Sequence, residues 1–310
     1  MRLLFSSMLA LGLMAGPAQA EWEPAGPIQF WIGFGAGGGT DTQARALAEE
    51  LEALKGWRVI PENKAGGGGR VMAAQLKDAP TDGLTVGLAI NTTFDFPTND
   101  NIQIDDFTLL TMTAGSQMAI LARADSGWTT LDDMVAAAKS GTEIVWANWG
   151  NQVEAGAEMV ARHFDIEVNH LRGKGGRSAV NALVANDANV GWGGGVQRPL
   201  VAAGELVILA AAEPERLEQA PDVPTLIERG VMQQGLGFQF VMVGPKGMDP
   251  EAADAITAAV HEILNNPKSK TAEFISKQYP PGPLVTAGED LEATLRANLE
   301  ANVEMMKQLQ

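Results

Sequence analysis

The chain has 310 residues, of which 45% are apolar and 19% are charged, which is typical of a globular protein long enough for two domains. Its 22 basic and 38 acidic residues give a net charge of −16, which argues against nucleic acid and anionic membrane surfaces as partners. It contains no cysteine, which excludes disulfides, thiol catalysis and a lipid-bearing N-terminal cysteine.

The first twenty residues have the pattern of a secretory signal peptide. Arg2 is followed by an apolar run over residues 3–13, and Ala18-Gln19-Ala20 is a small-residue cleavage site. The apolar run is too short to span a bilayer, and no later stretch reaches that length. We therefore expect residues 1–20 to be removed and the mature chain to be located in the periplasm.

A glycine-rich stretch, residues 33–41, follows the first predicted strand. The apolar run Ile28–Ile32 predicts that strand, and apolar residues at helical spacing over 44–54 predict a helix after the glycines. Thr40 and Gln43 match a capping box, which predicts a helix cap at Thr40. Glycine N–H groups at the positive end of a helix dipole can bind an anion, so this stretch is a candidate anion site. The alternative is a flexible or tightly packed turn without a ligand.

The same pattern follows in the next segment of the chain. Strands are predicted over 57–60 and 84–90, with a second glycine run, Gly66–Gly69, and a helix over 70–79 between them. Because parallel strands place their carboxyl ends at one edge of a sheet, both glycine loops are expected to face one crevice. Residues 91–104 are interpreted as an irregular excursion whose carboxylates lack the spacing of a calcium loop, so no metal is predicted.

Strand-like runs over 109–113 and 118–122 are predicted to cross into a second α/β half. In that half, strands are expected over 144–147, 168–171, 190–192 and 206–212. Its helices are expected after the cap Thr130, over 153–164, over 177–185 and up to Ala203. A strand over 238–243 is expected to return the chain to the first half, followed by helices over 251–265, 268–277 and 291–310. The predicted fold is two α/β domains around a ligand cleft, as in periplasmic binding proteins. Domain 1 is predicted as residues 21–115 with 242–310, and domain 2 as residues 116–241.

Residues for catalysis are few. His163, His170 and His261 have no metal-ligand spacing, and no Gly-x-Ser-x-Gly elbow occurs. The one enzyme-like motif is the match of residues 33–38 to the dinucleotide fingerprint, with Glu62 near the end of the second strand. This motif alone is weak, so an NAD-linked enzyme remains only an alternative.

Basic and aromatic residues flank the predicted loops. The basic residues are Arg70, Lys174, Arg177 and Arg198. Each is a solvated surface charge or part of a positive site for an anionic ligand. Trp149 lies in the polar segment 148–151 and Trp192 at a strand end, where each is either a core residue or a wall of the cleft.

From about Pro27 to its C-terminus the chain resembles the extracytoplasmic solute receptors of tripartite tricarboxylate transporters, the Bug-type or tricarboxylate-binding receptors. The matching motifs are Phe34–Asp41, Ala44-Arg45, Asn63–Gly69, Asp82–Thr85, Lys174-Gly175 and Pro221–Thr225. The resemblance implies a Venus-flytrap fold that binds a carboxylate and delivers it to a membrane permease. It also implies that the two glycine loops hold the first carboxylate and that the segment 150–153 meets the distal end of the ligand.

The ligand-binding residues predicted in this way are Phe34, Gly37, Gly38, Gly39, Thr40, Asp41, Gly66, Gly67, Gly68, Asn91, Thr92, Trp149, Gly150, Asn151, Gln152, Lys174 and Gly193. The chain departs from the family pattern at Asn151 and Gln152, where hydroxyls are usual, and at Glu154, where histidine is frequent. Glu154 would repel a distal carboxylate if it pointed inward. The distal end of the ligand is therefore predicted to be uncharged, either an aromatic group or a polar group such as an amide. The four basic residues favour the alternative, a second carboxylate at that end.

The sequence as a whole predicts a periplasmic solute-binding receptor that captures a small organic carboxylate for a tripartite transporter. Neither catalysis nor a cofactor nor a metal is expected, and the protein is predicted to be a monomer. A ligand-sensing input protein for a signalling receptor is the second alternative, beside the NAD-linked enzyme.

Overall fold

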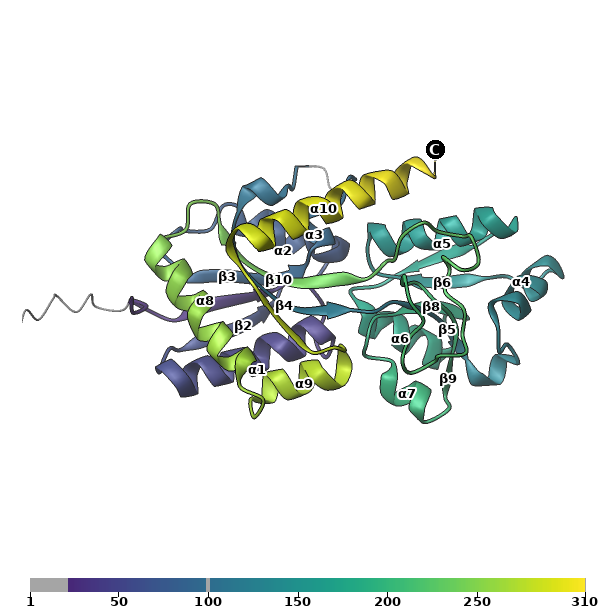
Figure 1. The fold of residues 1–310 in the computed structure, drawn as a ribbon, viewed down its shortest axis with the longest axis horizontal. Coiled ribbons are helices and arrows are strands. Elements are labelled where there is room, and N and C mark those ends of the chain that lie inside the picture. The colour runs from purple at the N-terminus through teal and green to yellow at the C-terminus, as the bar shows by residue number, and fades with distance from the viewer. Residues whose placement is uncertain (1–21, 99–100, 310) are drawn as a thin grey trace, which may run out of the picture.

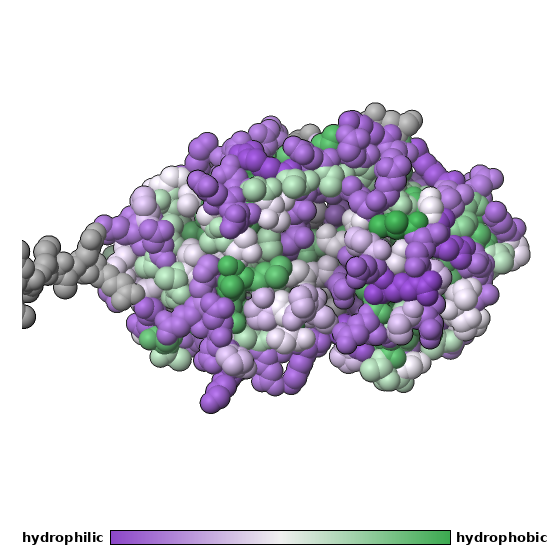
Figure 2. All heavy atoms as spheres, viewed as in Figure 1, coloured by the Kyte–Doolittle hydropathy of each residue, from purple (hydrophilic) through white to green (hydrophobic). Residues whose placement is uncertain are grey.

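A computed structural model of the protein describes residues 22–98 and 101–309. The predicted signal peptide lies outside the described residues. Two α/β halves lie side by side, and strands β4 and β10 connect them near the middle of the molecule (Figure 1). Hydrophilic residues cover most of the face shown in Figure 2, in keeping with the charged composition. Among the described residues, no helix has the length and apolar character needed to cross a membrane.

The first half contains a six-stranded sheet in the order β11-β4-β10-β3-β1-β2. Its strands are β1 (Ile28–Ile32), β2 (Val59–Asn63), β3 (Thr85–Ile90), β4 (Phe107–Ser116), β10 (Phe238–Pro245) and β11 (Pro283–Thr286). Its helices are α1 (Gly39–Lys55), α2 (Arg70–Leu76), α3 (Thr92–Asp95), α8 (Pro250–Asn265), α9 (Lys270–Gln278) and α10 (Gly288–Lys307), with 3-10 turns at Gly67–Gly69 and Ile104–Asp106. β1 pairs in parallel with β2 and β3, which places the loops after these strands at one edge of the sheet.

The second half contains a five-stranded sheet in the order β7-β6-β8-β5-β9. Its strands are β5 (Ala119–Arg123), β6 (Val145–Asn148), β7 (Asn169–Arg172), β8 (Val190–Gly193) and β9 (Leu206–Ala211). Its helices are α4 (Leu131–Lys139), α5 (Asn151–Phe164), α6 (Gly176–Ala185) and α7 (Arg198–Ala202), with a 3-10 turn at Ala124–Ser126. The predicted α/β class with two halves is confirmed.

The hinge lies where strands β4 and β10 of the first sheet connect to the second half (Figure 1). β4 pairs with β10 in antiparallel register from Phe107 opposite Pro245 to Ser116 opposite Phe238, and the chain changes sheet directly after Ser116 and directly before Phe238. The domain boundaries at 115/116 and 241/242 stay a prediction. Helix α10 reaches from the first half toward α5 (Figure 1), where Gln234 Nε2 of the second half donates a 2.7 Å hydrogen bond to the Ala301 carbonyl.

The capping box predicted at Thr40 is wrong. Helix α1 begins at Gly39 with Gly38 as its N-cap, and no side chain caps it. Gln43 is buried instead, and its Oε1 accepts a 2.9 Å hydrogen bond from Thr113 Oγ1. The long-range contact of Gln43 in the core therefore takes the place of the local cap. At α4 the predicted cap is confirmed, because Thr130 and Asp133 form a reciprocal capping box.

Several predicted boundaries differ from the structure. α5 begins at Asn151 rather than at residue 153, so Asn151 and Gln152 lie in its first turn. The excursion 91–104 contains the short helix α3, and α2 ends at Leu76 rather than at residue 79. β11 was not predicted, because four residues that begin with proline carry no alternating pattern. Trp192 is fully buried with its ring 5.3 Å from Trp146, so it is a core residue and not a wall of the cleft.

A buried carboxyl group makes the stability of the fold dependent on pH. Asp95 in α3 is 2% exposed, its Oδ2 accepts a 3.2 Å hydrogen bond from Asn91 Nδ2, and its Oδ1 has no partner among the described residues. Burial raises the pKa of this carboxyl from 3.8 to about 7. The folded state therefore binds a proton more tightly than the unfolded chain, and the stability from this proton is lost as pH rises from 3.8 toward about 7.

We expect Asp95→Asn, which cannot ionise, to raise the free energy of unfolding at about pH 8 by roughly 2–4 kcal/mol and to flatten its pH dependence. Urea unfolding of both proteins between about pH 5 and 8 measures this. The exposed Asp254 on α8 provides the matched control, and Asp254→Asn is expected to leave the pH dependence unchanged. Parallel stability curves for wild type and Asp95→Asn would contradict the prediction.

Candidate ligand-binding site

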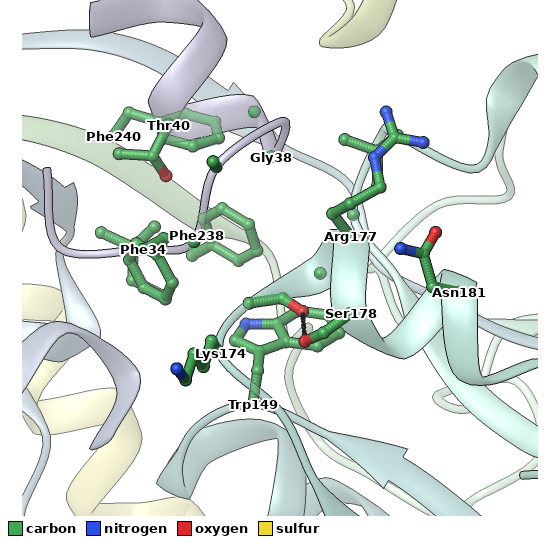
Figure 3. A pocket seen from close by; sticks show the side chains of 18 of the residues that line it. Phe34, Gly38, Thr40, Trp149, Lys174, Arg177, Ser178, Asn181, Phe238 and Phe240 are labelled. Atoms are coloured by element: carbon green, nitrogen blue, oxygen red, sulfur yellow. Dashed lines mark hydrogen bonds between the residues drawn. The ribbon is translucent and has the colours of Figure 1, made fainter. Parts of the chain in front are cut away.

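A cavity of about 140 Å³, called here the interdomain cavity, lies between the two halves. The first half lines it with Phe34, Gly35, Ala36, Gly38, Gly39, Thr40, Ile90, Phe238, Phe240 and Tyr279. The second half lines it with Trp149, Lys174, Gly175, Gly176, Arg177, Ser178, Asn181, Gly194 and Val196. Figure 3 shows these groups converging from the loop before α1, from β10 and from α6.

Two helices direct their N-termini at the interdomain cavity. α1 contributes its first residues Gly39 and Thr40, and α6 contributes Gly176 and Arg177. The N–H groups of these four residues donate to no acceptor among the described residues. Because the N-terminus of a helix carries a partial positive charge and free N–H donors, the two termini favour an anion over a cation at this end of the cavity.

The charged side chains of the lining are both basic. Arg177 Nε donates a 3.0 Å hydrogen bond to the Gly37 carbonyl of the other half, and the Gly35 N–H donates a 3.0 Å bond to the Lys174 carbonyl. Neither Arg177 nor Lys174 forms an ion pair with a carboxylate among the described residues, and Lys174 is exposed to solvent. These two hydrogen bonds join the halves, and the lining has no negative charge to oppose an anion.

Aromatic rings form much of the remaining wall. They are Phe34, Trp149, Phe238, Phe240 and Tyr279. The rings of Phe238 and Phe240 lie 5.3 Å apart, and those of Phe240 and Tyr279 lie 4.9 Å apart, both in edge-to-face geometry. In Figure 3 the rings of Phe34 and Phe238 lie near Trp149, and the Thr40 hydroxyl points toward Phe34. The cavity therefore joins a positive polar end to an apolar, aromatic wall.

Tyr279 closes the cavity against the first glycine loop. It is the chain's single tyrosine, is 2% exposed, and packs so closely on Gly39 that a Cβ at Gly39 would lie 1.7 Å from its hydroxyl oxygen. Burial raises the pKa of this hydroxyl, and the charge of Arg177 offsets only part of the rise. Tyr279 is therefore a protonated hydrogen-bond donor at the edge of the cavity.

The second glycine loop does not line this cavity. Gly67 and Gly68 line a neighbouring crevice of about 10 Å³ together with Thr92, Gly150, Asn151, Gln152 and Val153. Ile90 and Trp149 line both spaces and so separate them. At Gly68, whose φ is +67°, a Cβ would lie 3.2 Å from the Gly150 Cα, so glycine here allows the two halves to approach closely. The two loops thus lie at one interface but in different spaces.

The predicted site residues fall into three groups. Phe34, Gly38, Gly39, Thr40, Trp149 and Lys174 line the interdomain cavity, whereas Gly67, Gly68, Thr92, Gly150, Asn151 and Gln152 line the crevice. Gly37, Asp41, Gly66, Asn91 and Gly193 line neither. The Asp41 carboxylate accepts from the Gly37 N–H at 2.9 Å and from Asn63 Nδ2 at 2.8 Å, so it fixes the shape of the loop.

Of the features on which the distal-end prediction depended, Trp149, Lys174 and Arg177 line the interdomain cavity, whereas Glu154, Arg70 and Arg198 do not. Glu154 pairs with Arg172, with 2.8 Å between its Oε2 and the arginine Nε, and lines neither space. Arg70 Nε donates to the Gly67 carbonyl at 3.0 Å, and Arg198 also lies outside both linings. The lining residues that the sequence did not predict include Ser178, Asn181, Phe238, Phe240 and Tyr279. The return of the chain through β10 and the end of α9 brings the three aromatic ones to the cavity, and no local motif marks them.

Comparison with known proteins gives a consistent result. A profile of the family described as "Tripartite tricarboxylate transporter family receptor" matches residues 43–279. The chain is similar to the "UPF0065 protein in gbd 5'region" of Cupriavidus necator, with 29% identity over 282 residues that cover 87% of this chain and 85% of the relative. Its fold is similar to that of the periplasmic binding protein BugD, with a TM-score of 0.82, 24% identity and coverage of 92% and 98%. It is also similar to MatC of Rhodopseudomonas palustris with bound malate, with a TM-score of 0.80, 23% identity and coverage of 91% and 99%.

Proposed function

The chain belongs to the tripartite tricarboxylate transporter receptor family, and we propose that its interdomain cavity binds a small carboxylate with an apolar body the size of one ring. Membership makes the protein a solute-binding receptor rather than a sensor or an NAD-linked enzyme. The size of the cavity, about 140 Å³, agrees with this, because it is far too small for a dinucleotide. The proposal includes a periplasmic location, delivery to the transporter's permease subunits and no catalysis.

The carboxylate is proposed for the positive end of the cavity. The free N–H groups of Gly39, Thr40 and Gly176 and the guanidinium of Arg177 supply donors and positive potential there. A carboxylate has two acceptor oxygens and no donor, so it fits a site made of donors. The malate bound to the structurally similar MatC supports the same class of ligand.

The ring-sized body is proposed for the aromatic wall, and the lining by five aromatic side chains is the observation that carries this part. An apolar cavity of ~150 Å³ accommodates benzene, and the interdomain cavity has about 140 Å³. Burial of apolar ligand surface among these rings contributes about 25 cal/mol for each Å². The expectation of an aromatic ligand thus gains support from Phe34, Phe238 and Phe240, and not from Asn151 or Gln152 as the sequence suggested.

We expect a matching acid at about 100 times its dissociation constant to raise the free energy of unfolding by roughly 2.7 kcal/mol, which is a rise of several degrees in melting temperature for a chain of this size. A thermal-shift panel of aromatic monocarboxylates, short dicarboxylates and tricarboxylates measures it, with the corresponding primary amides as uncharged controls. If no acid raises the melting temperature above its amide, the carboxylate proposal is wrong. If only dicarboxylates or tricarboxylates do, the ring-sized body is wrong and the carboxylate stands.

A further inference from the structure

A second cavity, of about 400 Å³, lies at the hinge, and we call it the hinge cavity. Both halves line it: Asn298 and Asn302 come from α10, Gln239 from β10, and Gln152 and Gln234 from the second half. It shares Phe238 with the interdomain cavity and Gln152 with the crevice. The proposed solute site therefore adjoins a larger space, lined by several amide side chains, that the proposed function does not use.

Glu213 is the ionisable residue among the described residues that line the hinge cavity. It follows β9, and its Oε1 accepts a 2.6 Å hydrogen bond from the Met118 N–H, directly after the chain has crossed between the sheets. Its Oε2 has no partner among the described residues. Burial raises the pKa of this carboxyl from 4.5 to about 7, because no positive side chain of the lining stabilises its charge.

The amides of the hinge cavity present both acceptors and donors, because Gln239 Oε1 and Asn302 Oδ1 already accept hydrogen bonds while Gln152 Oε1 does not. Asn298 Nδ2 donates to Gln239 Oε1 at 2.8 Å, and Gln234 Nε2 donates to the Ala301 carbonyl at 2.7 Å. Gln152 is 5% exposed, and its Oε1 has no partner among the described residues. A buried acceptor without a partner is costly, and a ligand that donates hydrogen bonds would remove this cost.

We propose that the hinge cavity is a second ligand site, for a small organic cation that carries an ammonium group and at least one hydroxyl or amide. The ammonium would pair with Glu213, and its polar body would lie among the amides of α10, α5 and β10. An anion would face a carboxylate with no compensating base. A bare metal ion would find one carboxylate in a space much larger than itself, and the described residues contain no group of three metal-ligating side chains.

The position of this site links it to domain closure. Its walls belong to both halves, so its shape changes with the angle between them, and a ligand that fits one arrangement shifts the equilibrium toward it. The cation is therefore expected to change the affinity for the carboxylate, and by linkage the carboxylate changes the affinity for the cation by the same factor.

Calorimetry with ethanolammonium chloride tests the proposal on the full mature chain, with and without carboxylate in the interdomain cavity. Sodium chloride at equal ionic strength controls for charge screening, and ethylene glycol controls for the hydroxyl alone. Titration at about pH 7 in two buffers of different ionisation enthalpy reports proton release, which is expected because the cation favours the ionised form of Glu213. This readout needs no variant, and it does not require that the carboxylate proposal be correct.

Glu213→Gln keeps the shape of the side chain and its acceptor for Met118, and we expect it to weaken ethanolammonium binding at least tenfold and to abolish proton release. The exposed Glu215, two residues further on, provides the matched control, and Glu215→Gln is expected to bind as the wild type does. Saturable binding of ethanolammonium with these properties supports the site. Four results would each overturn the proposal. They are the absence of saturable heat, equal binding of ethylene glycol, saturation by sodium alone, and unchanged ethanolammonium binding by Glu213→Gln.

Discussion

Replacing Gly39 with alanine is expected to abolish solute binding. The added Cβ would lie 1.7 Å from the Tyr279 hydroxyl oxygen and 2.8 Å from the ring carbon that carries it, so the tyrosine must leave its position. Such overpacking typically costs about 1–3 kcal/mol of stability. The larger effect falls on the ligand, because the displaced ring would enter the interdomain cavity and the N–H groups at the start of α1 would shift.

Gly35→Ala is the matched control in the same loop. A Cβ at Gly35 would lie 3.5 Å from Lys174, which is an ordinary contact, and we expect this variant to keep its affinity within a few fold. The double variant Gly39→Ala/Tyr279→Phe removes the closest of the two clashes and is expected to regain part of the binding. Calorimetry with the best acid of the thermal-shift panel measures all three. Normal affinity in Gly39→Ala would remove Tyr279 and the start of α1 from the site.

Local signals accounted for most of the fold. The apolar run Ile28–Ile32 became β1 with the predicted bounds, and the cap at Thr130 was correct, since both patterns involve only neighbouring residues. The cap at Thr40 failed because Gln43 bonds to Thr113, seventy residues away in the sequence. A sequence pattern cannot weigh a local cap against such a contact.

The candidate site was predictable only in part, for the same physical reason. Phe34, Thr40 and Lys174 belong to loops whose motifs are visible in the sequence, and they line the interdomain cavity. Phe238 and Tyr279 reach it through the pairing of β10 with β4 and the packing of Tyr279 on Phe240, neither of which leaves a local pattern. The two glycine loops were expected in one crevice, but Ile90 and Trp149 divide the space between them.

The second large loss of affinity for the acid is expected from Arg177→Gln. Arg177 is the less exposed of the two bases in the lining, and it also joins the halves through the Gly37 carbonyl. Arg177 is partly exposed, so the loss of its charge-assisted hydrogen bond to the acid is expected to cost about 1.5–3 kcal/mol and to raise the dissociation constant at least about tenfold. Arg198→Gln removes the same charge outside the linings and is expected to bind normally. Equal losses in both variants would mean that Arg177 acts only through the overall field of the protein.

The same calorimetry decides between one carboxylate and two. If the ligand has a single carboxylate, Arg177 and the N-termini of α1 and α6 suffice to hold it. Lys174→Ala should then change the affinity for the acid only a few fold, because Lys174 is exposed to solvent. Phe238→Ala should then strongly weaken the binding of an aromatic monoacid, since it removes apolar contact area from the wall of the cavity. If wild type instead prefers a short dicarboxylate by about tenfold, or 1.4 kcal/mol, and Lys174→Ala abolishes that preference, Lys174 holds a second carboxylate and the ring-sized ligand is wrong.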